Sequence, residues 1–323
     1  MRRLALEGLR RYQYAQRPPI PRPAPAYVAD DRASLLHISD AAQKGRTPIV
    51  LIPSLVNPPH ILDLAPGASL ARYLVDQGHD VWLIDWGAPR AQDAGMGLAG
   101  HIEQLLLPLL RALEQPPILV GYCLGGTMAI GAASALPPKA LVAIATPWDF
   151  DAYPVDDKRT MTDIWDQNEK ACEKLGYVPM EYLQSGFWSL DPERTIAKYA
   201  AYADMEEGSD AERGFVTVED WANEGEPLTF GVGIDLFERF YPNNETVQGL
   251  WEVAGQSVSL DALTCPTLSI RAQQDRIVPA VAAPVLAENI DVPLGHVGMI
   301  VSSRAPDMLW APLSQWLAQH DRT

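Results

Sequence analysis

The sequence has few of the features that mark metal sites, nucleotide sites or membrane spans. Its 323 residues include three cysteines and six histidines, and no Cys/His cluster has the spacing of metal ligands. No Gly-x-Gly-x-x-Gly or Walker pattern follows a predicted strand. No apolar run approaches the roughly 18–20 residues of a membrane span. We therefore expect no metal, no bound cofactor and no transmembrane segment.

Positive charge is also scarce. The chain has 25 Lys and Arg against 41 Asp and Glu, a net charge of −16, which disfavours binding to nucleic acid. The first 22 residues are an exception, since they hold six arginines and one glutamate, a net +5 that leaves −21 for the rest. This basic segment predicts a short amphipathic helix, followed by an extended proline-rich tether at residues 18–23.

Two roles are open for this basic segment. We favour a helix that packs against the acidic body of its own chain, and the alternative is docking to a partner or to a lipid-coated granule surface. The segment lacks the apolar stretch of a signal peptide. Because three sparse cysteines are typical of free thiols in a reducing compartment, we expect a cytoplasmic protein.

Apolar runs alternate with helical patterns along the chain. Strands are predicted near residues 48–53, 80–85, 117–122, 140–145, 266–272 and 289–293, and helices near 69–78, 101–114, 124–135, 282–288 and 306–319. This alternation predicts an α/β fold with a doubly wound, mostly parallel sheet. Catalytic loops are then expected at the carboxyl ends of the strands.

One connection is too long for a simple crossover. About 120 residues separate the fourth predicted strand from the fifth, which predicts an inserted helical cap at residues 149–255. The remaining parts are a basic segment and tether at 1–30 and an α/β core at 31–148 and 256–323. The cap contains Trp165, Trp188, Trp221, Trp251, Phe187, Phe215, Phe230, Phe237 and Phe240. Such aromatics usually belong to a core, but together they predict an apolar face and a hydrophobic pocket over the active site.

The most informative motif is a cysteine between glycines at the end of the third predicted strand. Residues 121–126, Gly-Tyr-Cys-Leu-Gly-Gly, pass directly into a predicted helix, which is the pattern of a nucleophile elbow. Glycines leave room around a strained turn, and the amino-terminal amides of the helix favour a thiolate at Cys123. A cysteine can also be a small buried apolar residue. Whether Cys123 is a nucleophile therefore depends on whether the chain also supplies a base and an acid.

The base and its orienting acid are expected downstream, in the order nucleophile, acid, base. Only His296 and His320 follow Cys123, and His320 lies near a chain end, where fraying is expected. Asp275 comes just after the strand predicted at 266–272. We therefore predict a triad of Cys123, His296 and Asp275. The alternatives are a capping aspartate and a structural loop histidine.

Two backbone amides should stabilise an oxyanion beside this cysteine. One is expected from Leu124, the residue after the nucleophile. The other is expected from Val56, in the loop after the strand at 48–53, with Leu55 nearly as good. Pro58 and Pro59, further along the loop, have no N–H to offer.

Several segments, in this order, resemble the polyhydroxyalkanoate synthases, and especially the short catalytic subunits of the two-component enzymes. The segments are residues 56–64, 69–79, 81–87, 121–126, 145–150, 275–279 and 295–302. The resemblance implies an α/β-hydrolase fold in which Cys123 carries the acyl group, His296 is the base and Asp275 its partner. Two positions depart from the family pattern, since Leu294 replaces a glycine and Arg276 a histidine.

The resemblance predicts an acyltransferase that moves 3-hydroxyacyl groups from coenzyme A thioesters to a growing polyester. Cysteine suits this reaction because an acyl-cysteine is itself a thioester and keeps the acyl group activated. A second synthase subunit or a homodimer is the expected partner. Two alternatives stay open: a cysteine hydrolase, which differs in admitting water to the intermediate, and an inactive granule-associated or subunit-binding relative.

Overall fold

The computed structural model describes residues 1–17, 26–30, 32–39 and 46–321 of the chain. The proline-rich tether predicted at residues 18–23 lies outside these described residues. Within them, no helix combines the length and the apolar character needed to cross a bilayer.

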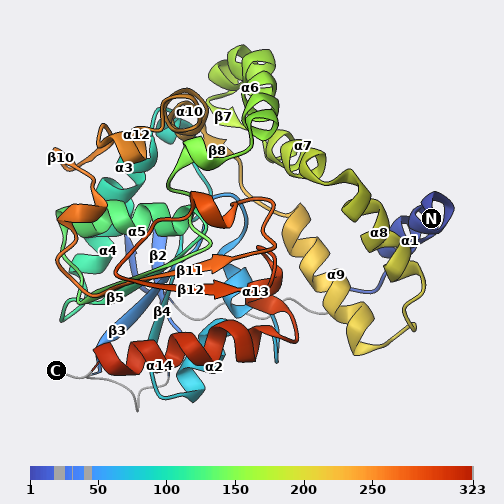
Figure 1. Ribbon diagram of the computed structural model, residues 1–323, viewed down its shortest axis with the longest axis horizontal. Helices are drawn as coiled ribbons and strands as arrows, with labels where there is room; N and C mark the ends of the chain where they lie inside the picture. The colour runs from blue at the N-terminus through green and yellow to red at the C-terminus, as the bar shows by residue number, and fades with distance from the viewer. Residues whose placement is uncertain (18–25, 31, 40–45, 322–323) are drawn as a thin grey trace.

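An eight-stranded sheet forms the centre of the molecule (Figure 1). Its strand order is β1-β2-β4-β3-β5-β6-β11-β12, with parallel pairing from β4 to β12 and antiparallel pairing of β1 with β2 and of β2 with β4. The strands are β1 (Ala26–Asp30), β2 (Ala33–His37), β3 (Pro48–Ile52), β4 (Asp80–Asp85), β5 (Ile118–Tyr122), β6 (Ala140–Ile144), β11 (Thr267–Ala272) and β12 (Glu288–Val292). The predicted doubly wound, mostly parallel sheet is confirmed.

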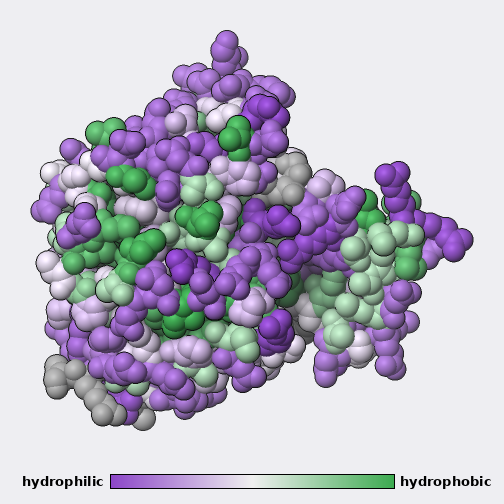
Figure 2. Space-filling model, in the orientation of Figure 1, coloured by the Kyte–Doolittle hydropathy of each residue, from purple (hydrophilic) through white to green (hydrophobic). Residues whose placement is uncertain are grey.

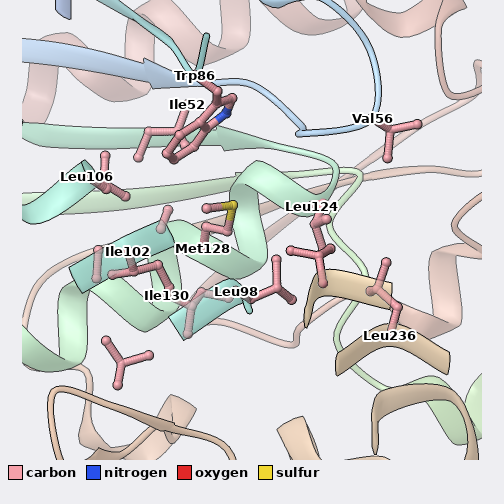
Figure 3. Packing of buried hydrophobic residues seen from close by; sticks show 14 of the residues in the cluster. Ile52, Val56, Trp86, Leu98, Ile102, Leu106, Leu124, Met128, Ile130 and Leu236 are labelled. Atoms are coloured by element: carbon pink, nitrogen blue, oxygen red, sulfur yellow. The ribbon is translucent and has the colours of Figure 1, made fainter. Parts of the chain in front are cut away.

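Helices cover both faces of this sheet. Successive side chains of β3 point to opposite faces, so Val50 and Ile52 join one apolar cluster and Ile49 and Leu51 the other. The first cluster includes residues of α3 (Leu98–His101), α4 (Leu107–Arg111) and α5 (Leu124–Ala135). The second includes residues of α2 (Leu70–Asp76), α13 (Gly298–Val301) and α14 (Ala311–His320). Figure 3 shows Met128 and Ile130 of α5 packed near Leu98 and Ile102.

Two sequence predictions differ from the structure. The helix predicted at residues 282–288 is wrong, because only a short 3-10 turn, Ala280–Ala282, forms there. Ala283 is extended because Pro284 follows it, and a residue before proline avoids helical geometry. The antiparallel hairpin of β1 and β2 was not predicted, and β1 lies in the stretch expected to be tether.

The long insertion between β6 and β11 is largely helical. Its helices are α6 (Val155–Leu175), α7 (Met180–Leu190), α8 (Pro192–Ala203), α9 (Asp210–Asn223), α10 (Phe230–Ile234), α11 (Tyr241–Asn243) and α12 (Glu245–Gln248), with a π-helical turn at Asp235–Phe240. Its short strands form the pairs β7 (Tyr177–Val178) with β8 (Leu228–Thr229) and β9 (Glu252–Val253) with β10 (Gln256–Ser257). In Figure 1, α8 and α9 project to the right of the sheet.

The basic amino-terminal helix α1 (Arg2–Gln13) packs on α8 and α9, and we call these three helices the arm. Arg11 pairs with Glu212 at 2.6 Å and Arg17 with Asp220 at 3.2 Å. A Cβ at Gly8 would meet the backbone of α8. The prediction of a basic helix held against the chain's own acidic residues is thus confirmed. Figure 2 shows a mainly hydrophilic surface on this side, with apolar residues on both body and arm.

Candidate active site

Cys123 occupies the sharp turn between β5 and α5. Its backbone has φ +54° and ψ −131°, a conformation that non-glycine residues rarely adopt and that is often found at functional sites. The Cys123 N–H donates to the carbonyl of Ile144 in β6 at 2.9 Å, which anchors the turn to the sheet. The side chain is half-buried and lies at the amino terminus of α5.

The glycines around Cys123 are required by close backbone packing. A Cβ at Gly121 would lie 2.4 Å from the Cα of Gly126, and a Cβ at Gly125 would lie 2.1 Å from the carbonyl oxygen of Ile52. Such separations are far below contact distance, so only glycine fits. The spacing of glycines in the motif therefore reflects how tightly β5, α5 and β3 meet.

Asp275 and His296 follow the neighbouring strands β11 and β12. The Nδ1 atom of His296 lies 2.6 Å from Oδ2 of Asp275, whose side chain is wholly buried. The other carboxylate oxygen of Asp275 accepts hydrogen bonds from the amides of Ile277 and Val278, at 2.8 and 2.9 Å. With Nδ1 donating to the carboxylate, Nε2 of His296 is left for a second partner.

Cys123 is near enough to His296 to interact with it. Burial lowers the pKa of His296, but the Asp275 carboxylate and then Cys123 outweigh burial and raise that pKa to about 10. The ring of Tyr122 lies 5.1 Å from the imidazole, and its hydroxyl donates to the carbonyl of His296 at 3.3 Å. The structure thus brings all three predicted triad residues together at the carboxyl edge of the sheet.

The candidate oxyanion donors also border this edge. Leu124 is the first residue of α5, where an amide has no intrahelical acceptor. The Val56 N–H donates to Oγ of Ser54 at 3.2 Å, so an oxyanion would compete with that hydroxyl. The neighbouring Leu55 amide donates to no acceptor in the described part of the chain.

Contacts from the arm hold the loop at residues 53–58, which we call the oxyanion loop. The Asn57 side-chain amide donates to the carbonyls of Trp221, Ala222 and Glu224, at 3.4, 3.4 and 3.0 Å. Nε1 of Trp221 donates to the carbonyl of Pro58 at 2.9 Å. Sequence analysis missed this role of Asn57, because no local pattern pairs it with residues so distant in the chain.

Trp86 fixes the other end of the oxyanion loop. Its Nε1 donates to the carbonyl of Pro53 at 3.0 Å, and Figure 3 shows the indole above Ile52. This tryptophan follows β4, so two segments far apart in the chain, the end of α9 and the residue after β4, hold the loop in place. The sequence singled out this segment only through its family resemblance.

An apolar pocket opens from Cys123 into the insertion. Its walls come from α6, α7 and the π-helical turn, together with Val56 and Leu124 of the core. Its lining residues are Val56, Cys123, Leu124, Pro147, Phe150, Tyr153, Met161, Ile164, Trp165, Asn168, Cys172, Val178, Tyr182, Leu183, Phe187, Leu236, Phe237, Tyr241, Ile277 and Val278. The apolar walls are typical of a site for a small organic molecule.

The predicted cap aromatics divide between this pocket and other places. Trp165, Phe187 and Phe237 line the pocket. The others lie elsewhere: Phe215 packs in the arm, Trp221 holds the oxyanion loop, Trp251 packs against Phe240, Phe230 stacks on Trp165, and Trp188 is 51% exposed. The apolar pocket that the set predicted is present beside the cysteine, and the aromatics that do not line it serve contacts within or between helices.

No group of three or more His, Cys, Asp or Glu side chains among the described residues is arranged to hold a metal ion.

The chain is similar in sequence to several poly(3-hydroxyalkanoate) polymerase subunits named PhaC. The chain is 29% identical over 311 residues to the poly(3-hydroxyalkanoate) polymerase subunit PhaC of Haloferax mediterranei, covering 91% of this chain but 63% of that protein. The PhaC subunit from Thiocystis violacea is 29% identical over 317 residues, covering 91% of this chain and 88% of that protein. No family model matches the chain.

Solved structures share the fold at low identity. A putative non-heme bromoperoxidase, BpoC, from Mycobacterium tuberculosis has a TM-score of 0.54 and 13% identity, covering 91% of this chain and 98% of that one. A hydrolase from Pseudomonas aeruginosa has a TM-score of 0.52 and 17% identity, covering 88% of this chain and 94% of that one.

The parallel sheet and the nucleophile elbow define an α/β-hydrolase fold. Within that superfamily, the chain resembles the poly(3-hydroxyalkanoate) polymerase subunits PhaC in sequence over most of its length.

Proposed function

We propose that this protein is an acyltransferase that moves 3-hydroxyacyl groups from coenzyme A thioesters, through an acyl-Cys123 intermediate, to the hydroxyl end of a growing polyester. The observation that carries the proposal is Cys123 at a strained elbow, beside a histidine oriented by a buried carboxylate, with an apolar pocket in front of it. The name shared by the relatives, poly(3-hydroxyalkanoate) polymerase, supports the polyester product.

The first step loads the enzyme. Because the pKa of His296 is raised to about 10, the proton of Cys123 lies on His296, and the thiolate Sγ attacks the thioester carbonyl, so that a new S–C bond forms. The oxyanion is stabilised by the amides of Leu124 and of Val56 or Leu55. The bond to coenzyme A then breaks, and its thiolate takes the proton from His296. Asp275 holds the imidazole in the required orientation and stabilises its charged form.

The second step extends the polymer. His296 takes the proton of an incoming hydroxyl group, the hydroxyl oxygen attacks the acyl-cysteine carbonyl, and a C–O bond forms. The C–Sγ bond breaks, and the thiolate of Cys123 is left beside protonated His296, ready for the next loading step. The apolar pocket favours this outcome because water would otherwise hydrolyse the intermediate. A second synthase subunit or a homodimer, and a granule surface, stay predictions for this chain.

The direct test incubates the purified protein with 3-hydroxybutyryl coenzyme A and measures free thiol, polymer and free acid. We expect thiol release with polymer. Cys123→Ala should abolish release and His296→Gln should severely impair it, whereas Cys265→Ala, outside the pocket, should keep the wild-type rate. Free acid alone would indicate the hydrolase, and no thiol release would indicate the inactive relative. A full rate in either triad variant would overturn the triad.

A further inference from the structure

The pocket in front of Cys123 contains few polar side-chain groups. Asn168 donates to the carbonyl of Ile164 in its own helix at 2.8 Å, so its amide is already engaged. Nε1 of Trp165 donates to Glu238 at 3.0 Å, and the other polar groups of the lining, apart from the two cysteines, are the phenols of Tyr153, Tyr182 and Tyr241. Polar groups in an otherwise apolar pocket set the orientation and specificity of a ligand.

Two of these phenols form a pair. Tyr153 lies just after the 3-10 turn Phe150–Ala152 that follows β6, and Tyr241 is the first residue of α11, so the pair joins the two ends of the insertion. Their rings meet edge to face, with centroids 5.3 Å apart. Phe150 packs against both rings, at 5.7 and 5.0 Å, and Phe237 stacks on Tyr241 at 6.0 Å. The two rings are therefore held in place by packing.

The hydroxyl groups of this pair lie near the nucleophile. Burial raises the pKa of both phenols, and Cys123 raises both further, while the two hydroxyls also interact with each other. Both phenols therefore stay protonated at neutral pH. In the described part of the chain, the hydroxyls interact with no side chain or backbone group apart from each other and these electrostatic neighbours.

A pair of hydroxyl groups cannot satisfy itself. Each phenol has one proton to donate and lone pairs to accept with, so when one donates to the other, one O–H is left over. The apolar side chains of the pocket offer that proton no hydrogen-bond acceptor, and leaving it unpaired is unfavourable. The pair consequently offers both a donor and an acceptor to whatever binds beside Cys123.

We propose that Tyr153 and Tyr241 form the subsite that recognises the 3-hydroxyl group of an acyl chain attached to Cys123. The inference rests on the proposed function and deepens it. A 3-hydroxyl lies only two carbons beyond the thioester carbonyl, so it stays close to Cys123, while the rest of the chain contacts the apolar wall. A plain acyl group would leave the phenols unpaired, and sites built to bind a hydroxyl reject analogues that lack it. The ligand class is thus a hydroxyacyl thioester rather than a plain acyl thioester.

The test compares loading of Cys123 by two thioesters that differ by this one hydroxyl. Single-turnover thiol release is measured with 3-hydroxybutyryl coenzyme A and with butyryl coenzyme A. The wild type should prefer the hydroxyacyl substrate. Tyr153→Phe and Tyr241→Phe should each lower that preference about tenfold or more, through slower loading of the hydroxyacyl group alone. Tyr182→Phe, which removes a phenol outside the pair from the same pocket, should keep the wild-type preference.

The outcomes separate this subsite from the proposed function. Wild-type protein that is loaded by neither thioester would overturn the proposed function and the subsite with it. Loading with an unchanged preference in both Phe variants would overturn the subsite alone. Equal losses with both thioesters would also overturn it, because they would mean that the phenols only support the fold. Thermal melting of each variant shows whether it is folded.

Discussion

The catalytic edge of the sheet and the arm are held in place by different interactions. At the edge, β5, α5 and β3 meet so closely that Gly125 has no space for a methyl group, and the Asp275 side chain is wholly buried. In the arm, α1 is held by an apolar cluster that includes Tyr12 and Tyr199, and by ion pairs such as that of Arg11 with Glu212, which remain partly exposed. Exposed ion pairs contribute little to stability and are screened by salt, whereas close backbone packing does not depend on salt. The site is therefore intolerant of added atoms, whereas the arm should tolerate changes at its exposed positions, although not at Gly8, where a Cβ would meet the backbone of α8.

The two regions meet at the oxyanion loop. Asn57 and Pro58 belong to the loop, and their partners lie at the carboxyl end of α9. The arm thus contributes to positioning the proposed oxyanion donors, although it contacts neither Cys123 nor His296 in the hydrogen bonds of the site. Four predictions test this comparison.

The largest effect is expected from adding one methyl group at the catalytic edge. Gly125→Ala should lose activity and at least about 3 kcal/mol of unfolding free energy, because its Cβ would overlap the backbone of Ile52 and Pro53. Gly214→Ala in α9 is the matched control, since no atom lies within 4 Å of its added Cβ. It should keep activity and gain up to about 1 kcal/mol. Urea denaturation measures the unfolding free energy of both variants. An equal loss in Gly125→Ala and Gly214→Ala would contradict the comparison.

The next effect concerns the His296–Asp275 pair. Asp275→Asn should lower kcat about 10³- to 10⁴-fold, because the imidazole loses its orienting acceptor. It should also change the pH dependence of stability. The pKa of His296 is raised in the folded state, so its contribution is complete below about pH 6.5 and disappears as pH rises through about 10.

The difference in unfolding free energy between wild type and Asp275→Asn should therefore shrink as pH is raised from 6.5 to 10. Denaturation curves at several pH values measure this difference, and NMR titration of the imidazole locates the pKa directly. A difference that grows with pH would show that the pair does not hold His296 in its charged form.

A smaller effect is expected where the two regions meet. Asn57→Ala removes the donor that ties the oxyanion loop to α9, so kcat should fall about tenfold with little change in KM, since a loosened donor stabilises the transition state less. Asn223→Ala, whose side chain bonds to Tyr12 and Glu219 within the arm, should leave kcat unchanged. If the two variants lose kcat equally, the loop contact has no special role.

The smallest effect is expected inside the arm. Arg11→Ala removes the ion pair with Glu212 and hydrogen bonds to carbonyls at the end of α8, which should weaken the arm by about 1 kcal/mol. Hydrogen exchange in α8 and α9 should speed up, less so at high salt, while kcat stays at the wild-type value. A large loss of kcat would mean that the arm and the site are coupled more tightly than the contacts indicate.

Much of the site could be predicted because each candidate residue directly follows an apolar run that can be recognised in the sequence. Each triad residue follows an apolar run, and parallel strands bring their carboxyl ends to one edge. The helix predicted at residues 282–288 is absent because Pro284 keeps Ala283 extended, although the apolar pattern there is helical. The β1–β2 hairpin was missed because short edge strands carry a weak pattern.

The sequence by itself determined the type of fold, the elbow and the identity of the three triad candidates, because strand periodicity and glycine spacing express backbone geometry directly. Only the tertiary structure decided which aromatics line the pocket, that Asn57 is held by α9, and that Tyr153 meets Tyr241. These contacts join residues far apart in the chain, and their geometry depends on how whole helices pack, which no local pattern records.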